Sequence, residues 1–378
     1  MKIKIILAAV LAASLSACSN TDKVTSVKPS GNIVVATVAS DFTSGSHASI
    51  QRGTDGSYTA SNNLVPTGSD ITVAAFGNHF YRIERNDGEN ITKFSFDDPQ
   101  TPIWQFSTKD NSSDAVSSNP HAMVFVNENK AYVIRYGKDK VWIVNPSATV
   151  EADFKIGELD LSAYGGADGI PDMDNAIIVN GKLFITMQRQ ENFVPGDAYV
   201  AVFDVLTDTE IDAGITGDAL KGIPLSVRNP NANIQYLAED NSVYISAIGS
   251  FSPNTFVGGV EKINVSTFKT HLVYNDESTF GTVADFAIKS PTQAYFIGYH
   301  GFVDNTLYAL NPITGVVSET KNSALIGVQL SSLNLDKSGD LWVSNSSAAS
   351  LYVINTVDDS ETAVIDTQLN PNKVVFGN

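Results

Sequence analysis

Two short runs near the end of the chain decide the fold: Leu341-Trp342-Val343-Ser344-Asn345 and Leu351-Tyr352-Val353-Ile354-Asn355. Both runs are rich in aromatic and β-branched side chains, both end in Asn, and a segment of small residues separates them. Short apolar runs bounded by turn-forming residues are typical of β-strands. The two runs therefore predict a pair of strands joined by a turn.

The same two-strand unit recurs throughout the chain. Its other copies begin at residues 80–83, 131–134, 183–186, 243–246 and 294–297, and a further copy covers residues 33–64. A third apolar strand precedes most copies, at residues 122–126, 175–179, 234–237, 285–288 and 332–335. Four strands repeating every 45–55 residues or so is the period of a β-propeller. Because sustained helical spacing is absent from the sequence, we predict an all-β protein: a seven-bladed β-propeller over residues 33–378.

The C-terminal segment predicts how the ring closes. Asn370-Pro371-Asn372-Lys373-Val374-Val375-Phe376 resembles Asn119-Pro120-His121-Ala122-Met123-Val124-Phe125, which opens a blade with its innermost strand. The C-terminal copy has no outer strands after it, and the N-terminal unit has no inner strand before Ile33. We expect the C-terminal strand to pair with the N-terminal blade, since this pairing leaves only short sheet edges.

The first residues have the pattern of an export signal. A basic start, Met1-Lys2-Ile3-Lys4, precedes an apolar run from Ile5 to Leu15 that is too short to span a bilayer as a helix. The run ends in Leu15-Ser16-Ala17-Cys18, which resembles the lipobox of bacterial lipoproteins. This resemblance implies a signal peptide at 1–17, a lipidated Cys18, a flexible tether over 18–32 and, from Ser19, anchoring in the outer membrane. Whether the body faces the periplasm or the cell surface stays open.

Charge and cysteine content exclude several classes of partner. The chain has 24 Lys and Arg against 41 Asp and Glu, a net charge of −17, and Cys18 is its single cysteine. A strongly acidic surface excludes nucleic acid and disfavours adsorption to anionic lipid, because both attract cations. The membrane link is therefore expected to be the lipid anchor, and the body is expected to be held by its core without disulfides.

Two blades carry a family resemblance. The runs at 342–345 and 351–355, followed by Ala363-Val364-Ile365-Asp366, and the unit at 131–146 are similar to the YVTN-type propeller repeat. The resemblance extends weakly over residues 33–376 and departs from the family pattern at inserts in blades 4 and 5, at 190–198 and 250–259. It implies the seven-bladed fold. Some seven-bladed lipoproteins of this kind capture vitamin B12 or other nutrients beside an outer-membrane transporter.

The expected ligand site lies at the mouth of the central channel, where second strands end and inner strands begin. Its predicted residues are Arg85, Arg135, Tyr136, Gln188, Arg189, Tyr299, His300 and Asn345 at strand ends, and His121 at the start of an inner strand. Arginines on three successive blades with tyrosines could hold a planar or anionic ligand by hydrogen bonding and stacking. Alternatively, these arginines pair with the excess carboxylates between blades.

An acidic loop is the one candidate metal site. Asp168, Asp172 and Asp174 lie within seven residues together with Gly169 and Pro171, and such oxygen donors suit Ca²⁺. The spacing does not match an EF-hand, and a solvated acidic loop explains the pattern equally well.

Catalytic signatures are absent from the sequence, which contains no Gly-x-Ser-x-Gly, phosphate-binding glycine loop or His-Glu-x-x-His. We therefore expect a non-catalytic binding protein that takes a small molecule or an outer-membrane protein partner, with no resident cofactor. One alternative is a structural or assembly protein of the cell envelope. Another is a metal-dependent, lactonase-like propeller hydrolase, for which Asp172, Asp174, Asn229 and Asp285 are the plausible donors.

Overall fold

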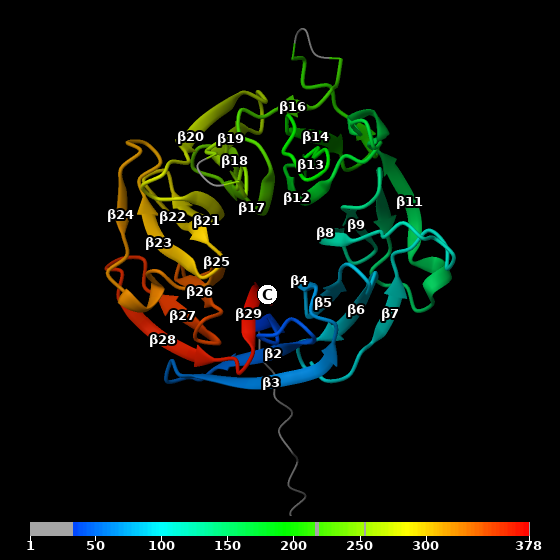
Figure 1. Ribbon diagram of the computed structural model, residues 1–378. Helices are drawn as coiled ribbons and strands as arrows, with labels where there is room; N and C mark the ends of the chain where they lie inside the picture. The colour runs from blue at the N-terminus through cyan, green and yellow to red at the C-terminus, as the bar shows by residue number, and fades with distance from the viewer. Residues whose placement is uncertain (1–32, 216–218, 253–254, 378) are drawn as a thin grey trace, which may run out of the picture.

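Seven antiparallel sheets form a ring around a central channel in the computed structural model, which describes residues 33–215, 219–252 and 255–377 (Figure 1). The predicted all-β class and seven-bladed propeller are confirmed. In the described ranges, helical structure is limited to the 3₁₀ turns Glu151–Asp153, Ser162–Tyr164 and Ser323–Leu325. No helix within them is long and apolar enough to cross a membrane. The predicted signal peptide, Cys18 and the tether at 18–32 lie outside the described residues.

The blades are numbered along the chain, and their strands are given from the channel outward. Blade 1 contains β29 (Asn370–Phe376), β1 (Ile33–Val38), β2 (Gly45–Arg52) and β3 (Tyr58–Thr67). Blade 2 contains β4 (Ile71–Phe76), β5 (His79–Glu84), β6 (Asn90–Ser95) and β7 (Trp104–Ser107). Blade 3 contains β8 (Pro120–Asn127), β9 (Lys130–Arg135), β10 (Lys140–Val144) and β11 (Lys155–Asp160). Blade 4 contains β12 (Met173–Val179), β13 (Lys182–Met187), β14 (Tyr199–Asp204) and β15 (Thr209–Glu210), and the short β16 (Ile223–Pro224) also pairs with β14.

Blades 5 to 7 follow the same plan. Blade 5 contains β17 (Pro230–Leu237), β18 (Ser242–Ala247), β19 (Gly259–Asn264) and β20 (Thr270–Asn275). Blade 6 contains β21 (Thr282–Ser290), β22 (Gln293–Gly301), β23 (Asp304–Leu310) and β24 (Val317–Glu319). Blade 7 contains β25 (Leu330–Leu335), β26 (Leu341–Asn345), β27 (Ser350–Ile354) and β28 (Glu361–Asp366).

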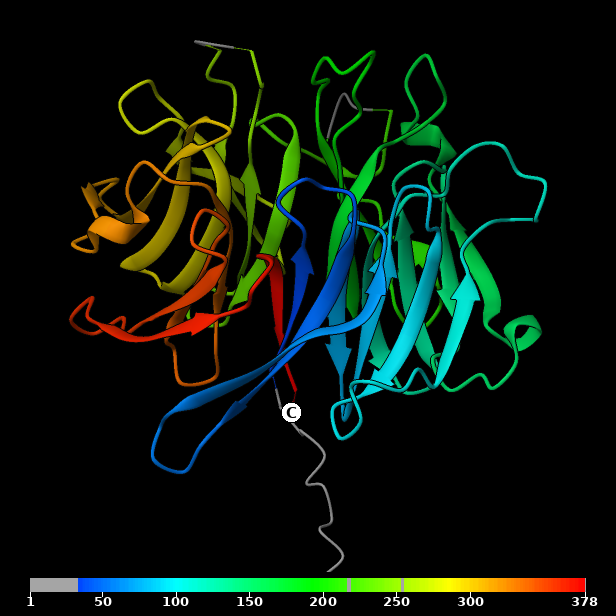
Figure 2. The ribbon, with the colours of Figure 1, turned by 60° about the horizontal axis from the view of Figure 1, so that its bottom comes forward.

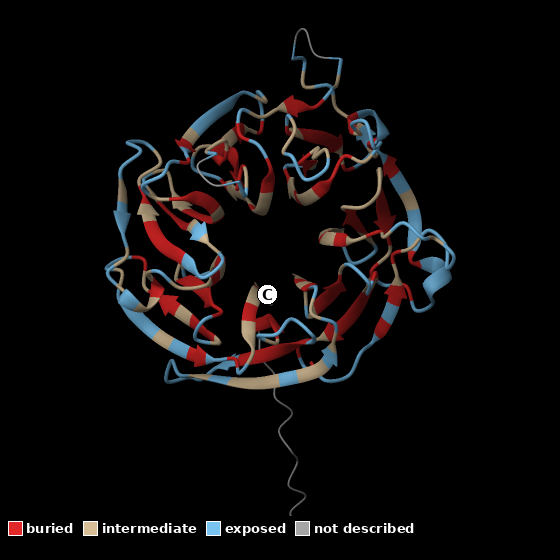
Figure 3. Ribbon diagram, in the orientation of Figure 1, coloured by how far each residue is buried: buried red, intermediate tan, exposed pale blue. Residues whose placement is uncertain are grey.

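The core lies between neighbouring blades, and this explains the strand patterns. Every residue of β26 is buried, whereas β28 at the perimeter is mostly exposed (Figure 3). A middle strand packs against neighbouring blades through both faces, so it requires apolar residues on both and reads as a continuous run. This is why the runs at 341–345 and 351–355 are so easily recognised, while the outer strands are not.

The C-terminal strand closes the ring, as predicted. β29 pairs antiparallel with β1, with Val374 opposite Val35 and Phe376 opposite Ile33. Val374 is 1% exposed and belongs to the apolar cluster of Trp342 and Val35, so β29 joins blade 1 to blade 7. Figure 2 shows this strand running down the channel to the labelled C-terminus on the lower face.

Candidate functional site

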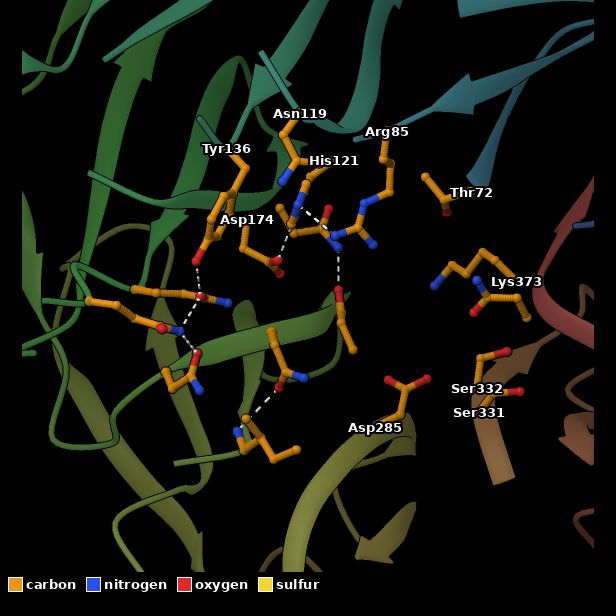
Figure 4. Close-up of a pocket in the computed structure, with 18 of the residues that line it drawn as sticks. Thr72, Arg85, Asn119, His121, Tyr136, Asp174, Asp285, Ser331, Ser332 and Lys373 are labelled. Carbon is orange, nitrogen blue, oxygen red and sulfur yellow. Dashed lines mark hydrogen bonds and ion pairs between the residues drawn. The ribbon is translucent and has the colours of Figure 1, made fainter. Parts of the chain in front are cut away.

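A polar cavity of about 490 Å³ occupies the channel mouth on the face where the innermost strands begin, which is the upper face in Figure 2. All seven blades contribute residues to its wall. Its volume is within the range of small-molecule pockets. In Figure 4, Arg85, His121, Tyr136 and Asp174 lie on one side of the channel, and Lys373, Ser331 and Ser332 lie on the other.

A repeated backbone arrangement positions the side chains over this cavity. In blades 3, 4 and 5 the residue before the innermost strand has a left-handed backbone: Asn119 (φ 40°), Asp172 (φ 52°) and Asn229 (φ 56°). Asn and Asp visit this region more readily than other non-glycine residues. The carbonyl of each accepts a hydrogen bond from the N–H that follows the second strand, which belongs to Tyr136 (3.0 Å), Gln188 (3.0 Å) and Ile248 (3.1 Å). These three positions are therefore structurally equivalent.

Blades 2 and 7 repeat the same contact. The N–H of Arg85 donates to the carbonyl of Asp70 at 2.8 Å, and the N–H of Ser346 donates to that of Gln329 at 2.8 Å. Arg85 is thus the blade 2 equivalent of Tyr136 and Gln188, and all three line the cavity together with His121. The structure brings these four predicted residues together.

Arg135 and Arg189 are displaced from this position by one residue, so the expected trio of channel arginines has to be revised. Arg135 precedes the equivalent position, and its side chain, 1% exposed, binds Asp110 at 2.6 Å and lies over the ring of Trp142. Arg189 follows the equivalent position and donates to the carbonyl of Tyr164 at 2.8 Å. Because successive side chains of a strand point to opposite faces, a shift of one residue removes each from the cavity.

The other predicted rim residues also lie away from the cavity wall. Asn345 is buried and donates from Nδ2 to the carbonyl of Ala324 at 2.9 Å, so it holds a turn. His300 is exposed. Tyr299 contacts the ring of Phe251 edge-on, with centroids 6.5 Å apart, and so stands behind a residue that does line the cavity.

A hydrogen-bonded chain runs along the wall formed by blades 2 to 4. Arg85 Nη2 lies 2.6 Å from Nε2 of His121, and Nδ1 of His121 lies 2.9 Å from Oδ1 of Asp174. The ring of His121 stacks on Tyr136 with centroids 4.4 Å apart, and Tyr136 donates to Oε1 of Gln188 at 3.0 Å. This geometry assigns the Nδ1–H tautomer to His121, with Nε2 accepting from the guanidinium.

Burial and neighbouring charges keep this wall in one protonation state. Burial lowers the pKa of His121 and the Arg85 charge lowers it further, while the hydrogen bond to Asp174 opposes the shift. Burial and the nearby carboxylates of Asp172 and Asp174 raise the pKa of Tyr136. At neutral pH the wall therefore presents a neutral imidazole and a neutral phenol beside the Arg85 guanidinium.

The opposite side of the channel contains a buried carboxylate, Asp285, and a partly buried lysine, Lys373. Asp285 accepts from the N–H groups of Phe286 and Leu333, both at 2.8 Å, and burial raises its pKa to about 6 despite the charge of Lys373. Lys373 donates to Oδ1 of Asn233, and burial lowers its pKa against the pull of Asp285.

The three carboxylates of the acidic loop are used separately. Asp168 accepts from the N–H of Ile170 at 2.9 Å and Asp172 from that of Gln190 at 2.6 Å, while Asp174 binds His121. Burial raises the pKa of Asp172 to about 6. Within the ranges that the structure describes, no group of three or more His, Cys, Asp or Glu side chains is arranged to hold a metal ion. The structure therefore does not gather the three residues suggested for Ca²⁺.

Sequence reasoning missed the apolar part of the wall. Phe193 and Phe251 line the cavity and are 94% and 67% exposed. Both lie in the inserts of blades 4 and 5, which interrupt the repeat and so have no equivalent to align with. An aromatic residue within a Gly- and Pro-containing insert on the channel face was the available signal. Lys373 also lines the cavity, although the sequence of its strand indicates only ring closure.

Comparisons with known proteins support the fold alone. No protein-family model matches the chain, and no curated protein matches it in sequence. A crystal structure of a candidate 6-phosphogluconolactonase from Bacteroides fragilis superposes with a TM-score of 0.60 at 11% identity, covering 92% of this chain and 97% of that one. A second such candidate, from Bacteroides uniformis, gives 0.60 at 13% identity, covering 91% and 98%. A protein from Lactobacillus plantarum gives 0.61 at 12% identity, covering 92% and 99%.

Proposed function

We propose that this protein binds a small anionic ligand at the channel mouth without transforming it chemically. The observation that carries the proposal is the set of contacts made by the guanidinium of Arg85. Its Nη2 lies 2.6 Å from Nε2 of His121 and its buried Nε forms an ion pair with Asp70 Oδ1 at 3.5 Å, while no described residue accepts a hydrogen bond from Nη1. A guanidinium at a cavity wall with unused donor capacity is suited to a carboxylate, sulfonate or phosphate group.

The balance of donors and acceptors supports an anion. Two cations, Arg85 and Lys373, and two carboxylates, Asp174 and Asp285, line the cavity. Both carboxylates already accept hydrogen bonds from within the protein. The donors of the two cations exceed the acceptors that they contact, so an acceptor-rich ligand complements the cavity.

The cellular setting remains part of the proposal. Lipidation at Cys18 would hold the protein at the outer membrane, where the cavity could take up a nutrient or present it to an outer-membrane protein partner. The chain has a net charge of −17 and therefore repels anions over most of its surface. An anion site requires local cations such as Arg85.

One observation favours a second candidate, a hydrolase. Asp174 orients His121 by a hydrogen bond to Nδ1, as a carboxylate orients a general base. However, Nε2 of His121 faces the guanidinium of Arg85 at 2.6 Å, and this charge weakens the base. Binding is therefore the better-supported function, and release of acid from lactones such as 6-phosphogluconolactone, abolished by His121→Gln, would favour the hydrolase.

Native mass spectrometry of the protein purified from its own envelope tests the proposal. We expect an added mass that disappears in Arg85→Gln and persists in Arg52→Gln, a matched change at an exposed arginine of β2. An added mass that survives Arg85→Gln would contradict the proposed site. A clean apo mass with a co-purifying protein would instead favour the structural or assembly role.

A further inference from the structure

The cavity wall is chemically divided. Blades 2 and 3 contribute Arg85, His121 and Tyr136, whereas blade 5 adds the apolar Ile248 and Phe251 beside Asn229 and Asn231. Ile248 occupies the position equivalent to Arg85 and Tyr136, as its N–H bond to Asn229 shows. The same backbone arrangement therefore presents donors on one side of the mouth and apolar groups on another.

Phe193 lines the cavity from a tight turn in the blade 4 insert. Glu191 and Val194 exchange two backbone hydrogen bonds of 3.0 Å, and the two residues between them, Asn192 and Phe193, have φ values of 52° and 65°. This is the type I′ geometry, in which glycine is preferred at the second central position. A phenylalanine there strains the backbone and exposes its ring, so neither local conformation nor packing within the chain explains this choice.

Phe251 is positioned by a loop whose two ends lie close together and by an aromatic neighbour. The base of its loop is fixed by the N–H of Arg228, which donates to Val257 at 2.8 Å, and by Gly258, whose N–H reaches Asp276 at 3.0 Å. A Cβ at Gly258 would come within 2.3 Å of the carbonyl of Ala247, so the loop ends can approach this closely only with glycine. Tyr299 contacts the Phe251 ring edge-on. The ring therefore contacts one aromatic neighbour, lines the cavity and stays 67% exposed.

We infer that the ligand of this cavity is an aromatic anion: its acidic group binds Arg85, and its ring system packs against Phe193 and Phe251. This inference rests on the proposed anion-binding function and specifies its ligand class. Both phenylalanines are exposed in the absence of a ligand, and a planar ring would cover them. The polar wall alone would suit a simple inorganic anion, but the two rings would then remain uncovered.

Calorimetric titration of the full-length protein with three probes tests this inference. Naphthalene-1-sulfonate carries both groups, inorganic sulfate only the anion, and 1-naphthalenemethanol only the rings. We expect naphthalene-1-sulfonate to bind more tightly than either of the others by about tenfold or more. Phe193→Gly and Phe251→Ser should each weaken it severalfold and leave sulfate binding unchanged, and Arg85→Gln should weaken both anions.

Phe302→Ser is the matched control, because Phe302 is exposed on a blade 6 loop and does not line the cavity. Equal affinities for sulfate and naphthalene-1-sulfonate, or equal effects of Phe251→Ser and Phe302→Ser, would overturn the inference and leave the anion-binding function standing. Failure of all three probes to bind would overturn both. Melting temperatures close to that of the unmodified protein show that each variant is folded.

Discussion

Lys373 of β29 donates a hydrogen bond across the channel to Oδ1 of Asn233 on β17, a residue 140 positions earlier in the chain. The amide of Asn233 in turn donates to the carbonyl of Leu333 on β25 at 2.7 Å. The C-terminal strand therefore does more than complete blade 1: through one lysine and one asparagine it links blades 1, 5 and 7 around the channel. The cavity depends on this strand, because Asn372 and Lys373 line it.

Deleting residues 370–378 is expected to abolish cooperative folding. The deletion would uncover Val35 and Trp342 in the cluster that Val374 completes, and it would expose the β1 edge. Circular dichroism during heating should show a broad transition or aggregation. Lys373→Met is the control, since it keeps the strand and removes one partly buried hydrogen bond, for a loss of about 1–3 kcal/mol. A truncated chain that melts like the full chain would contradict the closure role of β29.

The sequence predicted the ring but only part of the site, for physical reasons. Middle strands are buried on both faces, so their apolar runs repeat clearly, and seven blades with C-terminal closure followed from them. The direction of a side chain, by contrast, reverses when its position in a strand shifts by one residue. Arg85 and Tyr136 occupy the channel position, whereas Arg135, one residue away, packs on Trp142. Phe193 lies in an insert outside the repeat, where no periodicity indicates its environment.

Phe193→Gly is expected to stabilise the protein by about 1 kcal/mol, since it relieves the strained backbone of a bulky residue at positive φ. Chemical denaturation should show a higher midpoint with an unchanged slope. Phe302→Gly is the comparison, because Phe302 is also exposed but its backbone φ is not positive. If Phe193→Gly is less stable than the unmodified protein, the turn is not strained and one support for the ligand inference is lost.

Arg85→Gln should raise the pKa of His121. The guanidinium adjoins Nε2 and disfavours a second positive charge, so its removal makes protonation easier, whereas Asp174→Asn removes the favourable partner of Nδ1 and should lower the pKa further. NMR titration of the imidazole resonances measures both shifts. Shifts of the same sign in the two variants would contradict the arrangement of His121 between a cation and a carboxylate.

His47 should make the fold sensitive to acid. Its fully buried ring contacts the stacked rings of Phe80 and Phe94, with Nε2 2.7 Å from the carbonyl of Pro99, and Nδ1 lies 3.4 Å from Nη1 of Arg82. Burial, together with the Arg82 charge, lowers its pKa to about 4, although the bond to Pro99 opposes the shift. Between pH 6.5 and 4, His47 is protonated in the unfolded chain but largely neutral in the folded chain. The free energy of unfolding therefore falls as the pH falls.

The expected loss between pH 7 and pH 4.5 is about 2–3 kcal/mol from His47 alone. Asp172, Asp276 and Asp285, whose pKa values burial raises to about 6, act in the opposite direction because they take up protons in the folded state first. The His47 contribution must therefore be isolated by difference.

His47→Gln should be less stable than the unmodified protein at pH 7, and this difference should shrink by about 2–3 kcal/mol at pH 4.5 in urea unfolding. His271→Gln, at an exposed histidine, is the control, and a His47→Gln difference that stays constant with pH would show that the pKa of His47 is the same in the folded and unfolded chain.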